Sequence, residues 1–255
     1  MARIKILVVI PTYNEKDSLP EIAPQVLNLK EDVGLLIVDD ASPDGTGQVA
    51  ETLARNYPQR MWVLHRTGKN GLGSAYLDGF RWGISKLDGV DYFVQMDADG
   101  SHDPEAVLSL TEAAKSADLV IGSRYLNGIR ILDWPMRRLL LSYISNLVTR
   151  YASGLPLTDC TSGFKCFRRA TVEKILTKKI DAMSYDFQVE VNANCLWNRF
   201  KLVEVPITFH NRTQGNSKLT RADVVRAALM VSKLGFRRFL PLKLRSPDRL
   251  NSASG

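Results

Sequence analysis

The chain has 255 residues, enough for one large α/β domain with a buried core. Its hydrophobic fraction of 45% and charged fraction of 24% are typical of a globular protein and exclude a disordered polar chain. The net charge of +7 suits phosphate-bearing ligands or an anionic membrane surface. No zinc-ligand spacing or aromatic-plus-basic repeat accompanies this charge, so we expect no nucleic-acid partner.

The three cysteines, Cys160, Cys166 and Cys195, are odd in number and none belongs to a C-x-x-C pair. We interpret them as small buried side chains in a reducing compartment rather than as a disulfide or a metal site. The first apolar run is too short for a signal sequence, and no apolar stretch reaches the ~20 residues that span a bilayer. These features predict a cytoplasmic protein whose contact with a membrane is peripheral.

Short apolar runs alternate with helical patterns through the first half of the chain. Strands are expected at Ile4–Ile10, Leu35–Val38, Met61–Leu64, Tyr92–Met96 and Leu119–Gly122. Helices are expected at Leu19–Leu29, Thr46–Tyr57, Gly73–Lys86 and Pro104–Lys115. This alternation predicts an α/β fold with a parallel sheet that helices cover on both faces. In such sheets ligands bind at the carboxyl ends of the strands.

The second half of the chain is less regular. Helices are expected at Arg137–Tyr151, at Asp186–Asn198 and from Arg221 to about Phe239, and strands at Phe164–Phe167 and Leu202–Val205. Lysines and arginines dominate the chain from Lys233 onward, and we expect residues 241–255 to be a disordered basic tail. Residues 1–240 are expected to form a single domain.

The first expected strand is followed by Pro11-Thr12-Tyr13-Asn14-Glu15. We expect Pro11 to stop the strand. Tyr13 can then stack on a flat base, and Glu15 can accept hydrogen bonds from the base or from a ribose. The same residue types are typical of an ordinary strand-to-helix turn, and both interpretations stay open.

The second expected strand runs into Asp39 and Asp40. An acid at this position suits a ribose or the edge of a base. Because neighbouring residues of an extended chain point to opposite faces, only one of the two should reach a nucleotide, and we choose Asp40. For Asp44, which precedes Thr46, we prefer a role in capping the next helix.

Asp97-Ala98-Asp99 follows the fourth expected strand. Residues two apart in an extended segment point the same way, about 6.6 Å apart at Cα. Two carboxylates aimed at one point repel each other unless a cation lies between them or one is protonated. Carboxylate oxygens suit Mg²⁺ or Mn²⁺, which keep open positions for diphosphate oxygens. A solvated acidic turn is the alternative, but the place of this turn after a buried strand favours a metal site.

Seven motifs together resemble the inverting family 2 glycosyltransferases of the GT-A fold, whose Rossmann-like, mostly parallel sheet is flanked by helices. They are Pro11–Glu15, Val38–Gly45, Gly71–Gly73, Asp97–Asp99, Gly122–Tyr125, Asp159–Phe164 and Asn211–Lys218. The last two narrow the resemblance to the polyprenol-phosphate (dolichol-phosphate) mannose synthases, over about residues 4 to 235. Residues 1–240 would then be one GT-A catalytic domain. Many members have Gln-His or Ser-His at the position that Ser101-His102 occupies here, so a glutamine contact to the sugar is not available there.

The resemblance implies an enzyme that transfers mannose from GDP-mannose to a polyprenyl phosphate, with a membrane surface and a membrane-anchored protein among its partners. The implied guanosine contacts are Pro11, Tyr13, Glu15, Val38 and Asp40. The implied contacts to metal, diphosphate and mannose are Asp97, Ala98 and Asp99, with Mg²⁺ or Mn²⁺ held by the two aspartates. The implied phosphate-binding residues are Arg124, Arg212 and Lys218 for donor or acceptor, and Arg124, Arg138 and Ser142 for the acceptor phosphate. The implied catalytic residues are Asp97, Asp99 and Arg124.

Elementary chemistry agrees with these roles. The acceptor phosphate is already anionic and nucleophilic, so no strong general base is needed. A metal at Asp97 and Asp99 would act as a Lewis acid on the departing nucleoside diphosphate. Arg124 and Arg138 can grip the acceptor phosphate in bidentate fashion, although surface solvation is the alternative for both.

The expected helix at Arg137–Tyr151 has an apolar face beside two cations. That pattern suits an amphipathic helix on the acceptor side that lies at the membrane interface. It is equally the pattern of an ordinary helix that faces the core. The sequence leaves the two interpretations open.

Two other functions compete with mannose transfer. One is transfer of another hexose from a UDP-sugar such as UDP-glucose, or transfer to a saccharide acceptor. The motif at Asn211–Lys218 favours a lipid phosphate as the acceptor, and the Q-x-x-R-W motif expected of polysaccharide polymerases is absent. The other is a non-catalytic subunit that binds a nucleotide-sugar. The intact pair Asp97 and Asp99 argues against it.

Overall fold

The computed structural model describes residues 3–178, 180, 186–211, 232 and 235. These residues form a seven-stranded sheet in the order β3-β2-β1-β4-β6-β5-β7. The strands are β1 (Ile6–Thr12), β2 (Val33–Asp39), β3 (Met61–His65), β4 (Tyr92–Gln95), β5 (Leu119–Ser123), β6 (Lys165–Arg168) and β7 (Leu202–Pro206). The helices are α1 (Leu19–Leu27), α2 (Thr46–Asn56), α3 (Leu72–Lys86), α4 (Ala106–Ala114), α5 (Met136–Ser153), α6 (Arg169–Leu176) and α7 (Asp186–Trp197).

The sheet is parallel except for one strand. β6 runs antiparallel to both of its neighbours, β4 and β5, whereas the other pairs are parallel. Because β6 reverses direction between them, β4 and β5 point the same way. The predicted mostly parallel sheet is therefore confirmed, and its parallel strands all end at one edge.

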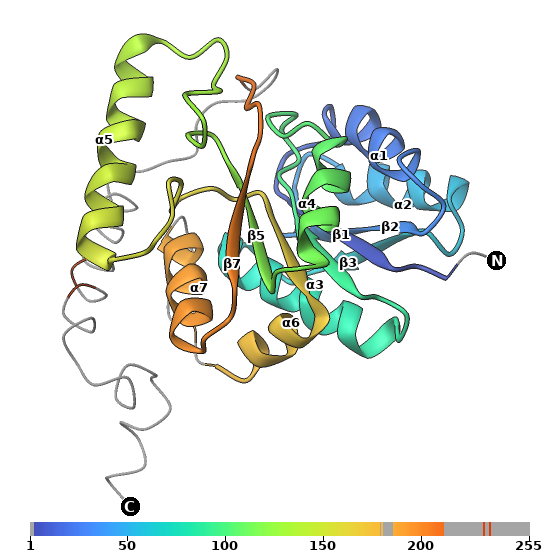
Figure 1. The fold of residues 1–255 in the computed structure, drawn as a ribbon. Helices are drawn as coiled ribbons and strands as arrows, with labels where there is room; N and C mark the ends of the chain where they lie inside the picture. The colour runs from blue at the N-terminus through green and yellow to red at the C-terminus, as the bar shows by residue number, and fades with distance from the viewer. Residues whose placement is uncertain (1–2, 179, 181–185, 212–231, 233–234, 236–255) are drawn as a thin grey trace, which may run out of the picture.

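Helices cover both faces of the sheet, and each face has its own apolar core (Figure 1). On β1, Ile6, Val8 and Ile10 pack against α1, α2 and α4. The alternate residues Leu7 and Val9 face α3, α6 and α7. This alternation follows from the two-residue period of an extended strand, and the central strands β1 and β2 are buried on both faces.

One local prediction is wrong: Pro11 does not stop the first strand. β1 continues through Pro11 and Thr12, which lie opposite Val38 and Asp39 of β2. The pairing of β1 with β4 has already ended at Val9. Proline is tolerated in a sheet where one side of the strand is unpaired, since its missing N–H is then not required for the ladder.

Other predictions differ in smaller ways. The expected helix at Arg137–Tyr151 is confirmed as α5, two residues longer at its end, and the short helix α6 was not anticipated. The three cysteines are free and buried, as predicted. The predicted helix from Arg221 to about Phe239, the tail at 241–255 and the site residues Arg212 and Lys218 lie outside the described residues. The division into a domain at 1–240 and a tail remains a prediction.

Helix α5 stands beside the layered body rather than over a face of the sheet (Figure 1). Its buried residues are polar: Asn146, Thr149 and Ser153. Beside the exposed Arg137 and Arg150 it carries large exposed hydrophobic residues: Met136, Leu140, Leu141, Tyr143, Ile144, Val148 and Tyr151. This is the reverse of a core-facing helix.

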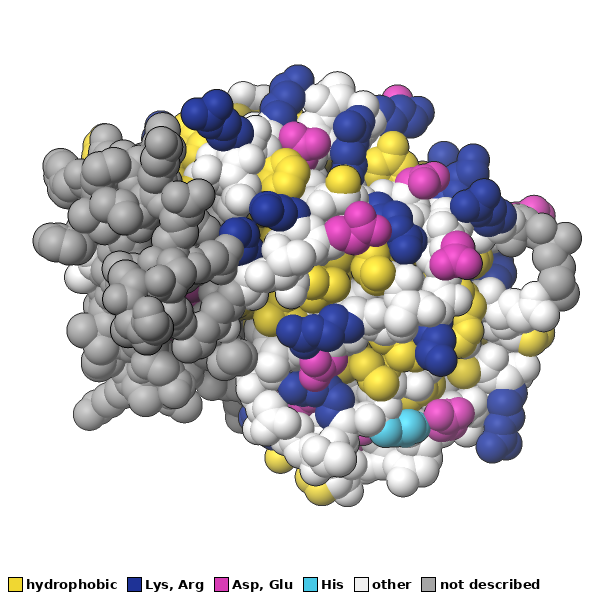
Figure 2. All heavy atoms as spheres, turned by 90° about the horizontal axis from the view of Figure 1, so that it is seen from below, with side chains coloured by type: hydrophobic (Ala, Val, Ile, Leu, Met, Phe, Trp, Pro, Cys, Tyr) yellow, Lys and Arg dark blue, Asp and Glu magenta, His cyan; other side chains and the backbone are white. Residues whose placement is uncertain are grey.

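The charged side chains seen from below are not separated by type, unlike the polar and apolar side chains of α5. Acidic and basic groups are interspersed over the face in Figure 2.

No helix in the described part of the chain is both long enough and apolar enough to span a membrane.

Candidate active site

Four loops with predicted site residues meet at the carboxyl edge of the sheet. They follow β1, β2, β4 and β5 and carry Tyr13, Asp40, Asp97 and Arg124. Since β1 lies between β2 and β4, the first three loops are neighbours. The arrangement expected from a βα series is therefore present, and each loop has its own way of fixing its side chains.

Asp39 and Asp40 have different surroundings, as the alternation of an extended chain predicts. The Asp39 carboxylate accepts hydrogen bonds from Thr12 Oγ1 at 3.1 Å and from the Ser42 N–H at 3.2 Å. It thereby ties the loop after β2 to the end of β1. The Asp40 N–H donates to the Thr12 carbonyl at 3.0 Å, and the Asp40 side chain points elsewhere.

The Asp40 side chain pairs with Arg66, a residue that the sequence analysis missed. Arg66 directly follows β3, and its Nε also lies 3.0 Å from Asp78 Oδ2. Burial raises the pKa of Asp40 above its ordinary value, against the opposing effect of Arg66. A cation at the end of the neighbouring strand was the one signal that could have revealed this pair.

Tyr13 and Glu15 lie in a loop held to the loop after β2. The Asn14 N–H donates to Ser42 Oγ at 3.1 Å, and the Glu15 N–H donates to Thr46 Oγ1 at 2.9 Å. The ring of Tyr13 carries the Lys69 ammonium group 4.1 Å from its centroid. Lys69 thus covers one face of the ring on which we expect a base to stack.

Two further predictions for this edge have clear outcomes. Asp44 Oδ1 accepts a hydrogen bond from the N–H of Thr46, the first residue of α2, at 3.0 Å, which confirms its structural role at the start of that helix. Val38 is fully buried, and its side chain packs towards Gly79 of α3. A contact from Val38 to a nucleotide would therefore have to use its main chain.

The two aspartates after β4 are each oriented by a neighbour. The Tyr76 hydroxyl lies 3.2 Å from Asp97 Oδ1 and 3.1 Å from the Met96 carbonyl. Ser101 holds Asp99 Oδ1 through its N–H at 3.1 Å and its hydroxyl at 2.6 Å. Burial raises the pKa of Tyr76 well above its ordinary value, and Asp97 adds to that shift, so the phenol stays a neutral donor.

His102 fixes the same loop from the other side. Its Nδ1 accepts the Asp97 N–H at 3.1 Å, which places the ring proton of a neutral imidazole on Nε2. The ring stacks on Phe164 with centroids 4.6 Å apart. Ser101-His102 therefore rigidifies the Asp97–Asp99 turn.

This donor set fits a divalent cation that is shared with a ligand. Asp97 and Asp99 supply hard oxygen atoms at the open end of β4. Among the described residues no group of three or more His, Cys, Asp or Glu side chains could hold a metal. Two protein carboxylates with the remaining positions left to water and phosphate oxygens is the usual arrangement for Mg²⁺ and Mn²⁺.

Arg124 is held in a buried ion pair that the sequence analysis did not foresee. Its Nε and Nη2 lie 2.7 Å and 2.9 Å from the two oxygens of Asp159, and Nη2 also lies 2.8 Å from Thr161 Oγ1. Burial acts to raise the pKa of Asp159, but Arg124 and the N–H donors outweigh it and hold that pKa below its ordinary value. The predicted bidentate grip of Arg124 on a phosphate is wrong, because Asp159 occupies that edge. Any contact to a phosphate would have to use Nη1.

Arg138 and Ser142 lie one turn apart on α5 and face the loop after β5. The Arg138 guanidinium stacks 3.9 Å over the Trp134 ring and donates from Nη1 to Asn211 Oδ1 at 3.1 Å. Ser142 Oγ lies 3.0 Å from the Tyr125 hydroxyl. Arg138 therefore lies beside Trp134 and Ser142 beside Tyr125, both in the loop after β5, and their role at an acceptor phosphate stays a prediction.

Phe209 lies between the turn that carries Asp97 and Asp99 and the start of α5. Its ring lies 5.5 Å from His102, from the Arg124 guanidinium and from Trp134. It follows β7 and stands just before the Asn211–Lys218 motif, but that motif alone does not indicate which side chains the ring contacts. It links the turn that carries the aspartates to the start of α5.

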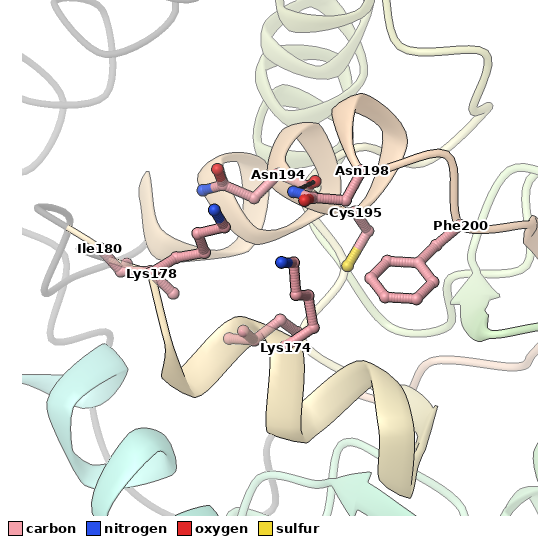
Figure 3. A pocket seen from close by; sticks show the side chains of 8 residues that line it. Lys174, Lys178, Ile180, Asn194, Cys195, Asn198 and Phe200 are labelled. Carbon is pink, nitrogen blue, oxygen red and sulfur yellow. Dashed lines mark hydrogen bonds between the residues drawn. The ribbon is translucent and has the colours of Figure 1, made fainter. Parts of the chain in front are cut away.

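A surface pocket lies at the other end of the sheet. It is lined by Lys174, Lys178, Asn194, Cys195 and Phe200 between α6 and α7 (Figure 3). Since α6 begins where the antiparallel β6 ends, this pocket is at the amino edge of the parallel strands. It is separate from the candidate active site.

The sequence matches the model of glycosyl transferase family 2 over residues 7–176, and the chain belongs to this family. It is 44% identical over 234 residues to the polyprenol monophosphomannose synthase of Mycolicibacterium smegmatis, with 91% of this chain and 88% of that relative covered. It is 44% identical over 232 residues to the undecaprenyl-phosphate mannosyltransferase of Micrococcus luteus, covering 91% of this chain and 94% of the relative. The predicted family is therefore confirmed.

Two more distant comparisons agree. The dolichol-phosphate mannosyltransferase of Pyrococcus furiosus is 37% identical over 223 residues, covering 85% of this chain and 59% of that protein. The fold resembles glucosyl-3-phosphoglycerate synthase from Mycobacterium tuberculosis, with a TM-score of 0.66, 18% identity and coverage of 91% of this chain and 80% of that one. That enzyme was solved with Mn²⁺, UDP-glucose and phosphoglyceric acid. The predicted GT-A fold is confirmed by this likeness.

Proposed function

We propose that the protein transfers mannose from GDP-mannose to a polyprenyl monophosphate, with inversion at the sugar and with the help of Mg²⁺ or Mn²⁺. The observation that carries this proposal is the position of α5. Its cationic and hydroxyl side chains, Arg138 and Ser142, face the catalytic edge while its apolar side chains are exposed. The names of the two relatives at 44% identity support the same sugar and the same class of acceptor.

The donor nucleotide would bind at the ends of β1 and β2. Tyr13 would stack on the guanine, while Glu15 and Asp40 would accept hydrogen bonds from the base or the ribose. Pro11 and Val38 would contribute main-chain contacts. The hydrogen bonds that join these loops, from Asn14 to Ser42 and from Glu15 to Thr46, would preorganise them for the ligand.

Asp97 and Asp99 would hold the metal, and Ala98 would lie beside the diphosphate. When bound, the metal would supply Lewis-acid stabilisation for the departing diphosphate. Tyr76 and Ser101 already fix one oxygen of each carboxylate, so the ligands need no reorganisation.

The acceptor phosphate would be oriented by Arg138 and Ser142, with Nη1 of Arg124 beside them. Arg212 and Lys218, which lie outside the described residues, would complete the phosphate-binding set. A phosphate monoester is already nucleophilic, so these residues need only hold two anions together for in-line attack.

The isoprenoid chain of the acceptor would contact the exposed apolar side chains of α5. Leu140, Leu141 and Val148 are 55%, 58% and 57% exposed, which is unusual for leucine and valine on one helix. These exposed side chains support an interfacial position for this helix, since a core-facing helix would bury them. The protein would then act as a peripheral protein on the cytoplasmic face of a membrane.

A transfer assay with purified protein tests the proposal. GDP-mannose, UDP-glucose and UDP-GlcNAc are each supplied with and without polyprenyl phosphate, and label in the lipid fraction is measured. We expect incorporation only from GDP-mannose with lipid, loss of activity on metal chelation, and a fall of at least about a hundredfold in Asp99→Ala with the fold retained. Incorporation from a UDP-sugar, or full activity of Asp99→Ala in metal-free buffer, contradicts it.

A further inference from the structure

Gln188, in the first turn of α7, carries a buried amide that has not been given a role. The residue is 2% exposed. Neither its Nε2 nor its Oε1 has a hydrogen-bond partner among the described residues. A buried amide without a partner is costly, so such a group in a native site points to a ligand that completes it.

The position of this amide connects it to the Asp97 turn. A Cβ atom added to Gly163 would lie 3.5 Å from Gln188 Nε2 and 3.8 Å from each carboxylate oxygen of Asp97. The amide and the carboxylate therefore border the same small space, which Gly163 leaves open because it has no side chain. Gly163 itself is partly exposed, so this space lies near the surface, although the amide of Gln188 is buried.

The backbone around Gln188 is firmly held. Its carbonyl accepts a hydrogen bond from the buried Lys165 Nζ at 2.9 Å. The preceding residue, Phe187, stacks parallel to Tyr76 with centroids 6.3 Å apart, and Tyr76 in turn contacts Asp97. The first turn of α7 is thus fixed relative to the carboxylate that we assign to the donor diphosphate.

We propose that Gln188 binds the hexose of the donor and helps to determine which sugar is accepted. An amide presents one donor group and one acceptor group, which matches a pair of neighbouring sugar hydroxyls. A site built around such a group discriminates strongly between sugars, because the wrong one leaves the amide unpaired. The inference rests on the proposed function, since it takes the space beside Asp97 to be the sugar site.

The test compares Gln188→Met with Asn194→Leu. Both substitutions replace a buried amide on α7 by an apolar side chain of similar size, and Asn194 Nδ2 likewise lacks a partner among the described residues. Asn194, however, lines the pocket at the opposite edge of the sheet. We expect Gln188→Met to weaken binding of GDP-mannose about tenfold in titration calorimetry while binding of GDP is unchanged. Asn194→Leu should change neither.

Gly163→Ala provides an independent test. The added methyl group would make only ordinary contacts with its neighbours, so the fold should tolerate it. It would narrow the space between Gln188 and Asp97 that we assign to one edge of the hexose, and we expect the same selective loss of GDP-mannose binding.

Two results overturn the inference: unchanged GDP-mannose affinity in both variants, or an equal loss for GDP-mannose and GDP. Failure of the proposed function would show itself separately, in wild-type protein that does not use GDP-mannose. The same variants are then titrated with the donor that it does use and with the matching nucleoside diphosphate. A selective loss of that donor still supports Gln188 as the sugar-binding residue.

Discussion

Helices α4 and α5 expose opposite kinds of side chain. α4 buries Val107 and Leu110 against the sheet, as an amphipathic helix in water should. α5 buries Asn146 and Thr149 and leaves Leu141 more than half exposed. The described part of α4 therefore hides its apolar side chains from water, whereas α5 presents an exposed apolar surface, which we propose is the surface that meets the lipid.

The polar side chains of α5 explain how such a helix is attached. Asn146 Oδ1 accepts the Cys160 N–H at 2.8 Å, and Asn146 Nδ2 donates to the Thr158 carbonyl. These bonds anchor α5 to the loop that also carries Asp159, the partner of Arg124. Because the anchoring is polar, the apolar side chains of α5 stay exposed.

Replacing one leucine by serine in each of the two helices should give the largest difference in the free energy of unfolding. Leu110→Ser places a hydroxyl in a filled core and should lower the free energy of unfolding by about 4 kcal/mol. Leu141→Ser should change it by less than about 0.5 kcal/mol, because the side chain is already exposed. Urea denaturation of the two purified variants measures both values.

Vesicle binding supplies the complementary measurement. Leu141→Ser combined with Val148→Ser should weaken sedimentation with anionic vesicles by about tenfold or more, since each buried apolar side chain is worth about 1.5–3 kcal/mol. Leu108 on α4 is partly buried and would not serve as a control, so Glu112→Ser on the exposed side of that helix is preferred. If Leu141→Ser destabilises the protein as much as Leu110→Ser does, α5 is an ordinary core helix and the comparison fails.

The ion pair of Arg124 and Asp159 joins the two regions and gives the next largest effect. Asp159→Asn leaves the buried guanidinium without its counter-charge and should cost about 3 kcal/mol of unfolding free energy at pH 7. Because the folded-state pKa of Asp159 is depressed, its contribution is present above its unfolded pKa of about 3.9 and is lost as the pH falls towards the folded value.

The pH dependence separates this charge effect from a packing effect. The difference in unfolding free energy between wild type and Asp159→Asn should be full at pH 7 and should shrink as the pH is lowered below about 4. Denaturation curves at several pH values measure it. A difference that stays constant with pH would mean that the variant merely packs badly.

Much of the fold and the outline of the site could be predicted from the sequence. Apolar runs located the strands, and the acids Asp40, Asp97 and Asp99 were found because they directly follow strands at the carboxyl edge. What the sequence could not supply is which side chains meet across the fold. Arg66 and Asp159 each pair with a residue more than twenty positions away, and periodicity carries no information about such partners.

The direction in which α5 faces was also beyond the sequence. An apolar stripe on a helix has the same spacing whether it meets a core or a membrane. Gln188 was missed for a related reason, since a lone glutamine in a helix is usually solvated and only its burial makes it notable. That its amide has no hydrogen-bond partner among the described residues becomes visible only in three dimensions.

The smallest effect concerns Tyr76, on the nucleotide side of the comparison. Tyr76→Phe removes the hydroxyl that orients Asp97 but keeps the ring that stacks on Phe187, so the fold should be retained. Loss of one hydrogen bond of about 1 kcal/mol should raise the concentration of Mn²⁺ needed for half-maximal GDP binding about fivefold. If Tyr76 acts through the carboxylate, the same substitution in an Asp97→Asn background should add nothing, because the acceptor that it orients has already been changed. Additive losses in this double-mutant cycle would mean that Tyr76 supports the core and not the metal site, and the preorganisation of the nucleotide half would then rest on Ser101 and His102 alone.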